Sequence, residues 1–433
     1  MKVLLHIAWA VIVVMCAGAC SKKESPNSVK AQTQAMEAAI RLAQIDPTDT
    51  MSLQNELLKA EAMRSAFALD SDSVAMEQFD ETFRETLLAK SPQMAKTLFA
   101  KTQQLNHKTM LTLEEYIKMA NDEINAIAYP SAPSGLYSPI AYTMQLGGKR
   151  LRPALVLMAC DAFGGNVERA LRPAVGLELF HNFTLLHDDV MDNADMRRGM
   201  PTVHKRWNAN TAILSGDAML SMSAQYIGQV DPDMLPRVNE LFHRTAMEIY
   251  EGQQYDMDFE VRNNVTINEY IEMIRLKTSV LIGCACKLGA IIAGASAEKA
   301  QALYDMGLSL GLAFQLQDDV LDVWGDEASF GKEIGGDIMN NKKTYLLIGA
   351  MQRAQGDDAI ELRRWLNDSY AIRDKKVPAV RALYERLGVR QAANAAIEHY
   401  NALALEALSK ADLPKEAHSA FERFINGLVG RVK

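Results

Sequence analysis

The sequence predicts an all-α protein, and three observations support this fold class. Gly and Pro interrupt regular structure, and they number only 25 and 13 among 433 residues, below their usual shares of about 7% and 5%. The chain holds 23 Met but only 7% aromatic residues, a composition that favours helices over a turn-rich β protein. From about residue 136 onward the apolar spacing is almost continuously helical, and no long run alternates as a strand would.

The same composition excludes three classes of protein. The formal net charge is −8, which argues against a nucleic-acid partner, because such binding needs Lys and Arg to neutralise phosphates. Five Cys in so long a chain do not make a disulfide framework. Only one stretch, near the N-terminus, is apolar enough to suggest a membrane span, so a multi-span membrane protein is excluded.

Residues 1–20 are typical of a targeting segment. The positive start Met1-Lys2 precedes an apolar run, and small residues follow up to Cys20. This order resembles a bacterial lipoprotein signal, in which Cys20 carries the lipid. An uncleaved membrane anchor and a plain soluble helix are the alternatives. The first two interpretations predict membrane association through residues 1–20.

Residues 21–109 are expected to form a small helical extension of unknown role. They are polar and charged, with apolar residues at helical spacing, and they hold no Cys/His cluster, Gly-rich loop or nucleophile motif. A new pattern opens at Met110. Thr112 with Glu115 three residues later fits a capping box at the start of a helix. Residues 110–433 are therefore expected to form a separate helical domain.

Two acid-rich helices carry the strongest chemical signal. The segment 177–192 reads LELFHNFTLLHDDVMD and holds no Gly or Pro, which predicts a helix. Asp188 and Asp192 stand four residues apart and share one helix face, with Asp189 beside them. The segment 308–324 repeats the same Asp-Asp-x-x-Asp spacing. Its acids are Asp318, Asp319 and Asp322.

The acid clusters have two interpretations. One such cluster alone could be a solvated helix end rich in Asp. Two copies, each after an apolar helical run, indicate instead that six carboxylates hold hard divalent cations. Mg²⁺ prefers oxygen ligands and commonly bridges one or two carboxylates to substrate phosphates. We therefore expect Mg²⁺, with Mn²⁺ as the alternative metal, and a phosphate or diphosphate ligand.

Basic residues are grouped around these clusters in the sequence. Guanidinium groups bind phosphate oxygens through two parallel hydrogen bonds, and Lys adds a point charge. Any one of these residues could be ordinary surface charge, but their grouping favours a diphosphate site. They are Lys149, Arg150, Arg152, Arg197, Arg198, Lys277, Lys332, Lys342 and Lys343.

These residues lie in motifs that resemble the trans-isoprenyl diphosphate synthases, also called polyprenyl synthetases. The motifs GGKRLRP, LLHDDVMDNADMRRG, KTS, FQLQDDVLD and GKEIGGDIMNNKKTYLL follow the family's order and spacing over roughly residues 111–433. The resemblance implies an isoprenoid synthase bundle of helices around a deep central cavity, usually in a homodimer. It implies a prenyltransferase that joins isopentenyl diphosphate head to tail to an allylic diphosphate. Nothing in residues 1–109 matches the family.

The resemblance also implies a role for each acid. Asp188 and Asp192 are implied to bind Mg²⁺ on the allylic diphosphate, with Asp189 beside them. Asp318 and Asp322 are implied to do the same from the opposite wall of the cavity. The implied catalytic set is Asp188, Asp189, Asp192, Asp318, Asp319, Asp322 and Lys277.

Two further groups of residues are implied to hold the substrates. His181 belongs to the second group, and helix geometry agrees, because it lies seven residues, or about two turns, before Asp188 on nearly the same face. A satisfied core histidine is the alternative for His181, and His187 is expected to be structural. The groups are Arg197, Lys277, Thr278, Gln315, Lys332 and Lys342 (in preference to Lys343) for the allylic diphosphate, and Lys149, Arg152, His181 and Arg198 for isopentenyl diphosphate.

The cavity below the first acid cluster is expected to set the product length. Phe183 and Thr184 stand five and four residues before Asp188, and an aromatic followed by a small residue is similar to the family's C20 pattern. On an ideal helical wheel, Phe180 lies about 80° and Phe183 about 140° from Asp188, so either Phe could form the floor. Simple core packing is the alternative for both. We expect geranylgeranyl (C20) diphosphate first and farnesyl (C15) diphosphate second.

Two other functions are kept open. A class I terpene cyclase ionises the same kind of diphosphate in a similar fold but needs no second-substrate site. A non-catalytic envelope lipoprotein or regulatory subunit is suggested only by the N-terminus. Isopentenyl diphosphate is cytoplasmic, so we expect the catalytic domain, residues 110–433, in the cytoplasm. Either the enzyme starts at Met110 or an uncleaved anchor tethers it to the membrane.

Overall fold

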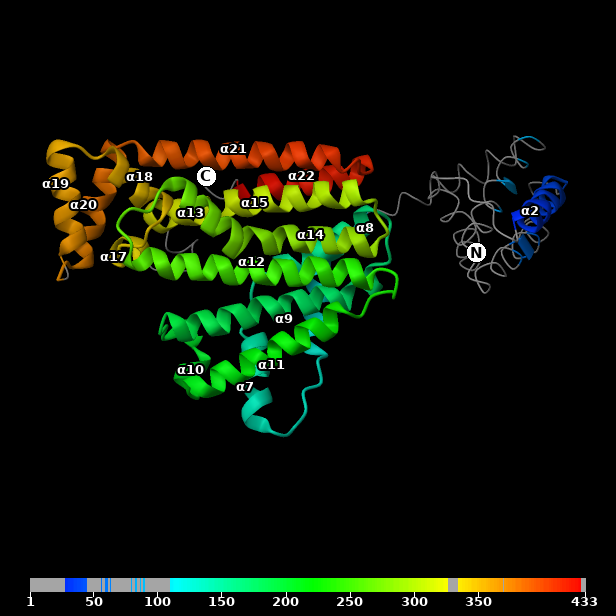
Figure 1. Cartoon of the computed structure of the whole chain (residues 1–433), viewed down its shortest axis with the longest axis horizontal. Helices are drawn as coiled ribbons and strands as arrows, with labels where there is room; N and C mark the ends of the chain where they lie inside the picture. The colour runs from blue at the N-terminus through cyan, green and yellow to red at the C-terminus, as the bar shows by residue number, and fades with distance from the viewer. Residues whose placement is uncertain are drawn as a thin grey trace. The chain divides into compact units, whose positions relative to one another are not determined.

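The computed structural model describes residues 28–44, a few single positions between 56 and 89, and residues 110–325, 334–368 and 370–429. The chain divides into two compact units, Met1–Thr109 and Met110–Lys433 (Figure 1). No described helix is both long and apolar enough to cross a membrane. The predicted signal or anchor segment, with Cys20, lies outside the described residues.

The first unit contains helix α2, which spans Ser28–Ala43. Ala31, Ala35 and Leu42 are fully buried, and their spacings of four and seven residues place them on one face of the helix. Near the end of α2, Arg41 Nε lies 3.1 Å from Glu56 Oε2. This face of α2 is therefore a packing surface.

The second unit is built almost entirely from helices in its described part, which confirms the predicted all-α class. The predicted capping box is present, because the N–H of Glu115 donates to Thr112 Oγ1 at 3.2 Å and the Glu115 carboxylate accepts from the N–H of Thr112 at 2.7 Å. In chain order the elements are α6 (Leu113–Asn125), α7 (Ser134–Gln145), α8 (Leu151–Ala162), α9 (Val167–Met191), β1 (Met196–Arg197), β2 (Met200–Pro201), α10 (Val203–Arg206), α11 (Ala209–Ile227), α12 (Leu235–Val261), α13 (Ile267–Ile274), η2 (Arg275–Ser279), α14 (Val280–Ile292), α15 (Ala297–Trp324), α17 (Gly336–Met339), α18 (Tyr345–Arg353), α19 (Gly356–Asn367), α20 (Arg373–Arg386), α21 (Val389–Lys410) and α22 (Lys415–Val429).

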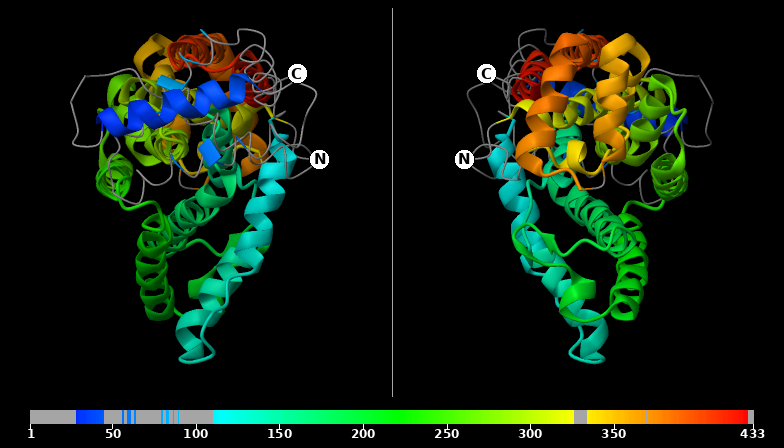
Figure 2. Two further views of the ribbon diagram at one scale, coloured as in Figure 1. Left: turned by 90° about the vertical axis from the view of Figure 1, so that its right-hand side faces the viewer. Right: turned by 90° about the vertical axis from the view of Figure 1, so that its left-hand side faces the viewer.

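Long helices pack side by side in this unit. Helix α14 contacts both α8 and α15, α9 packs on α8 and α11, and α21 runs along α15 (Figures 1 and 2). Helices α14 and α15 come close together because Gly283 faces Gly307, where a Cβ on Gly307 would meet the Gly283 Cα at 2.9 Å. Helices α19 and α20 lie together at one end of the unit. Strands β1 and β2 pair as a short antiparallel hairpin, which follows the first acid cluster in the chain.

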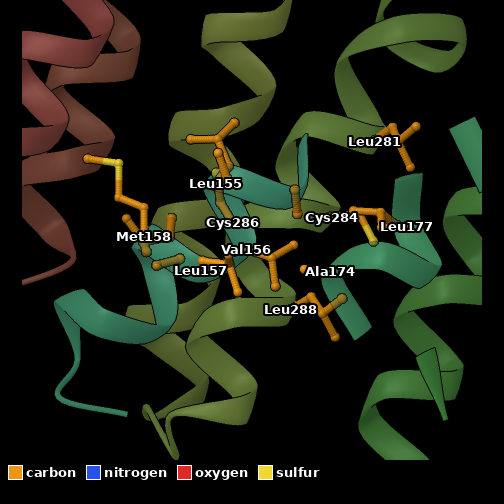
Figure 3. Close-up of a cluster of buried hydrophobic side chains, with 14 of the residues drawn as sticks. Leu155, Val156, Leu157, Met158, Ala174, Leu177, Leu281, Cys284, Cys286 and Leu288 are labelled. Atoms are coloured by element: carbon orange, nitrogen blue, oxygen red, sulfur yellow. The ribbon is translucent and has the colours of Figure 1, made fainter. Parts of the chain in front are cut away.

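Helix α14 forms the centre of the apolar core, as Figure 3 shows. Lys287 is the one charged residue of α14, and its other residues are apolar, which is typical of a helix buried over most of its surface. Leu288 of α14 is buried with Leu155 of α8 and Leu177 of α9, and each such side chain contributes about 1.5–3 kcal/mol. Cys284 and Cys286 are buried free thiols that pack in this core, and burial raises the pKa of the Cys284 thiol to about 12.

Candidate active site

A cavity of about 1530 Å³ opens among the helices of the second unit. Residues from four motifs that lie far apart in the sequence contribute to its lining. The predicted site residues in this lining are Lys149, Arg152, His181, Asp189, Arg197, Arg198, Thr278, Gln315 and Asp318.

The first acid cluster lies at the C-terminal end of α9. Asp189 is buried and binds the guanidinium of Arg197, with Nε 2.8 Å from Oδ2 and Nη2 2.7 Å from Oδ1. Asp188 is half-buried and Asp192 is exposed. Burial raises the pKa of Asp188, and the neighbouring Asp192 acts in the same direction. These two carboxylates are thus held close together, an arrangement that a divalent cation stabilises.

The second acid cluster lies near the C-terminal end of α15 and is held from behind. Asp319 is buried, and the Tyr270 hydroxyl donates to its Oδ2 at 2.5 Å. The Asp322 carboxylate accepts from the N–H of Asp337 at 3.0 Å. Burial, followed by repulsion from Asp337, raises the pKa of Asp319 to about 7 and that of Asp322 to about 6. Asp318, which directly precedes Asp319 in sequence, lines the cavity.

Lys277 lies on a π-helical turn, η2, of a kind that is frequent at functional sites. The turn comes close to α12 because Gly252 leaves room, since a Cβ there would clash with the Lys277 backbone nitrogen. Lys277 Nζ donates to Asp256 Oδ2 at 2.6 Å. On the same turn, Thr278 Oγ1 lies 3.4 Å from Gln315 Oε1. Two helices, α12 and α15, therefore orient the KTS motif.

The cavity lining contains a cationic group, which consists of Lys149, Arg152 and Arg198 with the His181 ring beside them. Arg152 Nη1 lies 3.1 Å from His181 Nε2. Burial, followed by the charges of the surrounding arginines, lowers the pKa of His181 well below its ordinary value. The ring is therefore neutral, and it accepts the hydrogen bond from Arg152. Lys149 Nζ stands 5.9 Å from the centre of the Phe314 ring.

Arg150 fixes the backbone of the GGKRLRP motif. Its side chain is buried and donates to Glu178 Oε1 at 2.7 Å and to the Met144 carbonyl at 2.6 Å. Arg198 donates in turn to the carbonyl of Gly147. These contacts set the conformation of the loop that presents the motif's lysine to the cavity.

Of the two neighbouring lysines, Lys342 is the one that faces the acid clusters. Burial lowers the pKa of Lys342, but Asp337 and carboxylates of both clusters outweigh burial and raise it. Lys343 Nζ instead donates to the backbone carbonyl of Glu260 at 3.3 Å. Lys332 lies outside the described residues.

An aromatic cluster lies one to two helical turns before the first acid cluster. Phe180 and Phe183 are buried, with ring centres 5.6 Å apart. Tyr250 of α12 lies 6.3 Å from both rings, and the His187 ring packs edge-on against Phe183 at 4.8 Å. The Thr184 hydroxyl donates to the backbone of its own helix. Both Phe side chains therefore belong to one cluster, which the helical wheel left undecided.

Sequence reasoning missed four residues of this site. Tyr270 of α13 lies 49 residues before the Asp319 that it contacts, and Tyr250 of α12 lies far from Phe180 in sequence. Asp256 of α12 lies 21 residues before the Lys277 that it contacts, and no local spacing marks that pair. Asp337 lies inside the quoted GKEIGGDIMNNKKTYLL motif but was given no role.

The donor set fits a divalent metal that binds together with a diphosphate. Within the described part of the chain, no three His, Cys, Asp or Glu side chains are grouped so as to hold an ion by themselves. Mg²⁺ keeps several waters and is commonly bound by one or two carboxylates plus substrate phosphates. Asp188, Asp192 and Asp318 are the residues that would hold it. Burial raises the pKa of Asp188, and Asp192 adds to that rise, so a cation beside the two carboxylates would offset both effects.

Comparison with known proteins identifies the family. The polyprenyl synthetase model matches residues 133–387, more than half of the chain. The chain belongs to the polyprenyl synthetase family. A geranylgeranyl diphosphate synthase from Methanosarcina mazei is 42% identical over 250 residues, which cover 56% of this chain and 77% of that protein.

Solved structures agree with this polyprenyl synthetase assignment. A crystal structure of a geranylgeranyl pyrophosphate synthase has 44% identity and a TM-score of 0.72, covering 75% of this chain and 100% of that chain. A geranylgeranyl pyrophosphate synthase from Corynebacterium glutamicum, complexed with isoprenyl diphosphate and magnesium, has 26% identity and a TM-score of 0.67, covering 74% of this chain and 100% of that chain. The predicted family, helical fold and prenyltransferase class are confirmed.

Proposed function

We propose that this polyprenyl synthetase condenses isopentenyl diphosphate head to tail with allylic diphosphates and releases geranylgeranyl (C20) diphosphate. One observation carries the proposal: the cavity lining brings Arg152 and His181 of the cationic group together with Asp189 and Asp318, one carboxylate from each acid cluster. One bound diphosphate needs only one of these sites, whereas two substrates need both. Relatives and structures similar to this chain are named for geranylgeranyl diphosphate synthesis.

The allylic diphosphate would bind between the acid clusters. Mg²⁺, when bound there, supplies electrostatic stabilisation of the departing diphosphate. Lys277, oriented by Asp256, and Lys342 add fixed positive charge where the negative charge develops. Arg197 is held in the wall by Asp189, so its position is set before the substrate arrives.

Isopentenyl diphosphate would bind to the cationic group. Arg152 Nε is buried and has no hydrogen-bond partner within the described structure. A buried donor without a partner is unfavourable by about 1–3 kcal/mol, and a phosphate oxygen would remove that penalty. His181 stays neutral and holds Arg152 from the side. The charge of Arg152 is therefore left available to the diphosphate.

The reaction then balances without a protein nucleophile. The allylic C–O bond breaks, and its electron pair leaves with the diphosphate. The alkene of isopentenyl diphosphate attacks the allylic cation and forms the new C–C bond. A proton leaves the adjacent carbon, and the released diphosphate is the base that we propose for it. Apolar lining residues such as Leu310 and Phe314 would exclude water that could trap the cation.

The aromatic cluster of Phe180, Phe183 and Tyr250 would stop chain growth at C20. The growing chain extends from the first acid cluster, and the two Phe residues lie one to two turns before that cluster on the same helix. Farnesyl (C15) diphosphate is the second candidate product, if the cluster stops growth one unit earlier. A terpene cyclase is disfavoured, because it would have no use for the cationic group around Arg152.

We propose that the enzyme works as a homodimer. Ile213 and Leu214 on α11 are 45% and 60% exposed, which gives an apolar surface on which a second copy can pack. Sedimentation of the purified chain tests this proposal. A dimer that Leu214→Lys dissociates supports it, and a monomeric native chain contradicts it.

We propose that residues 110–433 act in the cytoplasm, where isopentenyl diphosphate is made. The role of residues 21–109, and the choice between a lipidated Cys20, an uncleaved anchor and a start at Met110, can be tested together. The mass of the native protein separates them. An intact N-terminus at Met1 contradicts the Met110 start, and a lipid on Cys20 contradicts a cytoplasmic catalytic domain.

The requirement for both substrates tests the proposed function most simply. The full chain is incubated with Mg²⁺ and an allylic diphosphate, with and without isopentenyl diphosphate, and released diphosphate is measured. We expect about one diphosphate per C–C bond formed and no product without isopentenyl diphosphate. Arg152→Met should raise KM for isopentenyl diphosphate, whereas the exposed Arg381→Met should not. Product formed from the allylic substrate alone would identify a cyclase instead.

A further inference from the structure

Helix α20 contacts residues 334–342, the segment that ends at Lys342. Arg373 donates to the carbonyl of Ile334, at the start of that segment. One residue later, Gly335 has a φ of 82° and packs so closely on Val377 that a Cβ would meet its methyl groups at 2.7 Å. Helices α19 and α20 otherwise lie at the periphery of the unit (Figures 1 and 2). Helices α19 and α20 contact this segment directly, and Tyr384 of α20 also packs against Trp324 of α15, with ring centres 6.4 Å apart.

Lys376 of α20 contacts the segment at Asn341, directly before Lys342. Asn341 has the left-handed φ of 50°. Lys376 Nζ donates to Asn341 Oδ1 at 2.7 Å and to the carbonyl of Met339 at 3.4 Å. On its other side, Asn341 Nδ2 donates to the carbonyl of Leu366 in α19 at 3.0 Å. The Asn341 side chain is thus hydrogen-bonded to both peripheral helices, to α19 through Leu366 and to α20 through Lys376.

Lys376 is an unusual residue for this place. Its exposed fraction is only 3%, and it makes no ion pair with any described residue. A buried ammonium is unfavourable unless its hydrogen bonds are satisfied, and an apolar side chain of the same length would pack there without that penalty. Packing alone does not explain a lysine here, whereas holding Asn341 does.

The residue that follows Asn341 is Lys342. Its own N–H donates to the carbonyl of Asp337 at 3.0 Å, and its carbonyl accepts from the N–H of Thr344 at 2.8 Å. With the backbone fixed on both sides, the left-handed turn at Asn341 decides which way the Lys342 side chain leaves the chain. Carboxylates of both acid clusters raise the pKa of Lys342, so its ammonium lies within electrostatic range of both clusters.

We propose that Lys376 is a positioning residue that sets Lys342 against the allylic diphosphate through Asn341. The inference rests on the proposed function, in which Lys342 binds that diphosphate. It assigns to α19 and α20 the task of keeping one active-site cation in place.

The test compares Lys376→Met with Lys375→Met in the full chain. The two substitutions are identical, but Lys375 is exposed, and its side chain makes no hydrogen bond or ion pair with the described part of the segment. We expect Lys376→Met to raise KM for the allylic diphosphate or lower kcat by about 10-fold, as removal of an outer-shell partner commonly does. KM for isopentenyl diphosphate should change less than about twofold, because Arg152 and His181 lie on other helices. Lys375→Met should match the wild type.

A double-mutant cycle separates positioning from general damage. If Lys376 acts through Lys342, then Lys376→Met has no further effect in a Lys342→Ala background. Asn341→Gly, which keeps the left-handed turn but removes the side chain that Lys376 contacts, should reproduce the allylic defect. Its thermal midpoint should also fall, because the buried Lys376 ammonium then loses a hydrogen-bond partner. An equal loss from Lys376→Met in both backgrounds, or kinetics equal to those of Lys375→Met, would overturn the inference.

The kinetics of Lys342→Ala and Lys376→Met distinguish failure of the proposed function from failure of the positioning role. If Lys342→Ala itself leaves allylic KM and kcat unchanged, the assignment of Lys342 in the proposed function is wrong. If Lys342→Ala is defective and Lys376→Met is not, the proposed function stands and the positioning role of Lys376 is wrong.

Discussion

Replacing Phe183 by Ala should lengthen the product beyond C20. Phe183 is buried, and its ring lies 5.6 Å from Phe180, 4.8 Å from His187 and 6.3 Å from Tyr250. Removing a buried ring in such a cluster lowers the free energy of unfolding by about 3–5 kcal/mol, because the neighbours refill the space only partly. The remaining space is the space that a longer prenyl chain can enter.

The space left by the ring also favours binding of a longer prenyl chain, and the size of that gain in binding free energy can be estimated. One further isoprene unit brings five carbons out of water, and at about 0.8 kcal/mol for each buried carbon group the gain is at most about 4 kcal/mol. Each 1.4 kcal/mol changes a partition about tenfold. Even a third of that gain would therefore make a C25 product abundant, while C20 would remain the main product of the wild type.

The assay is the carbon number of the product, measured by mass spectrometry after dephosphorylation. Phe421→Ala is the matched control, because Phe421 is also fully buried but lies on α22 outside the aromatic cluster. Both variants should lose similar stability, and only Phe183→Ala should extend the product. An unchanged product from Phe183→Ala, or equal lengthening by Phe421→Ala, would refute the assignment of the floor.

Three further predictions follow from single contacts. Asp256→Asn removes the charged partner of Lys277, so KM for the allylic diphosphate should rise about tenfold while KM for isopentenyl diphosphate stays constant; equal shifts in both would count against it. Arg150→Met leaves the buried Glu178 without its cation and should lower the urea-measured free energy of unfolding by about 3–5 kcal/mol, which Arg150→Met/Glu178→Leu should largely restore; no recovery would argue against the pair. The pKa of His181 is well below its ordinary value in the folded protein, so below pH about 6.5 the ring gains a proton only when the chain unfolds. As the pH is lowered through this range, the free energy of unfolding should therefore fall by up to about 1.4 kcal/mol per pH unit. His181→Gln should lack this part of the slope, and an identical slope would show that the folded ring is protonated.

The sequence was most informative where the chemistry repeats locally. The capping box at Thr112 and the helices around the two acid clusters depend on spacings of three and four residues, which the sequence displays directly. The family motifs added an expected role for each charged residue. None of these inferences needed a contact between distant parts of the chain.

What the sequence did not predict depends on such contacts. Asp256 meets Lys277 because Gly252 lets the π-helical turn approach α12, and neither the turn nor the approach has a local signature. Spacing alone also does not decide whether Lys342 or Lys343 binds the diphosphate. The left-handed conformation of Asn341 decides which of the two lysines lies near the acid clusters. Helix packing supplied these partners, and spacing alone could not.

The product of the full chain tests the central claim most directly. The purified protein is incubated with Mg²⁺, isopentenyl diphosphate and, separately, the C5, C10 and C15 allylic diphosphates, and the carbon number of each product is determined. We predict that all three starters converge on C20, because one aromatic floor ends every chain. Products that keep different lengths, or no condensation by a folded protein, would contradict the account.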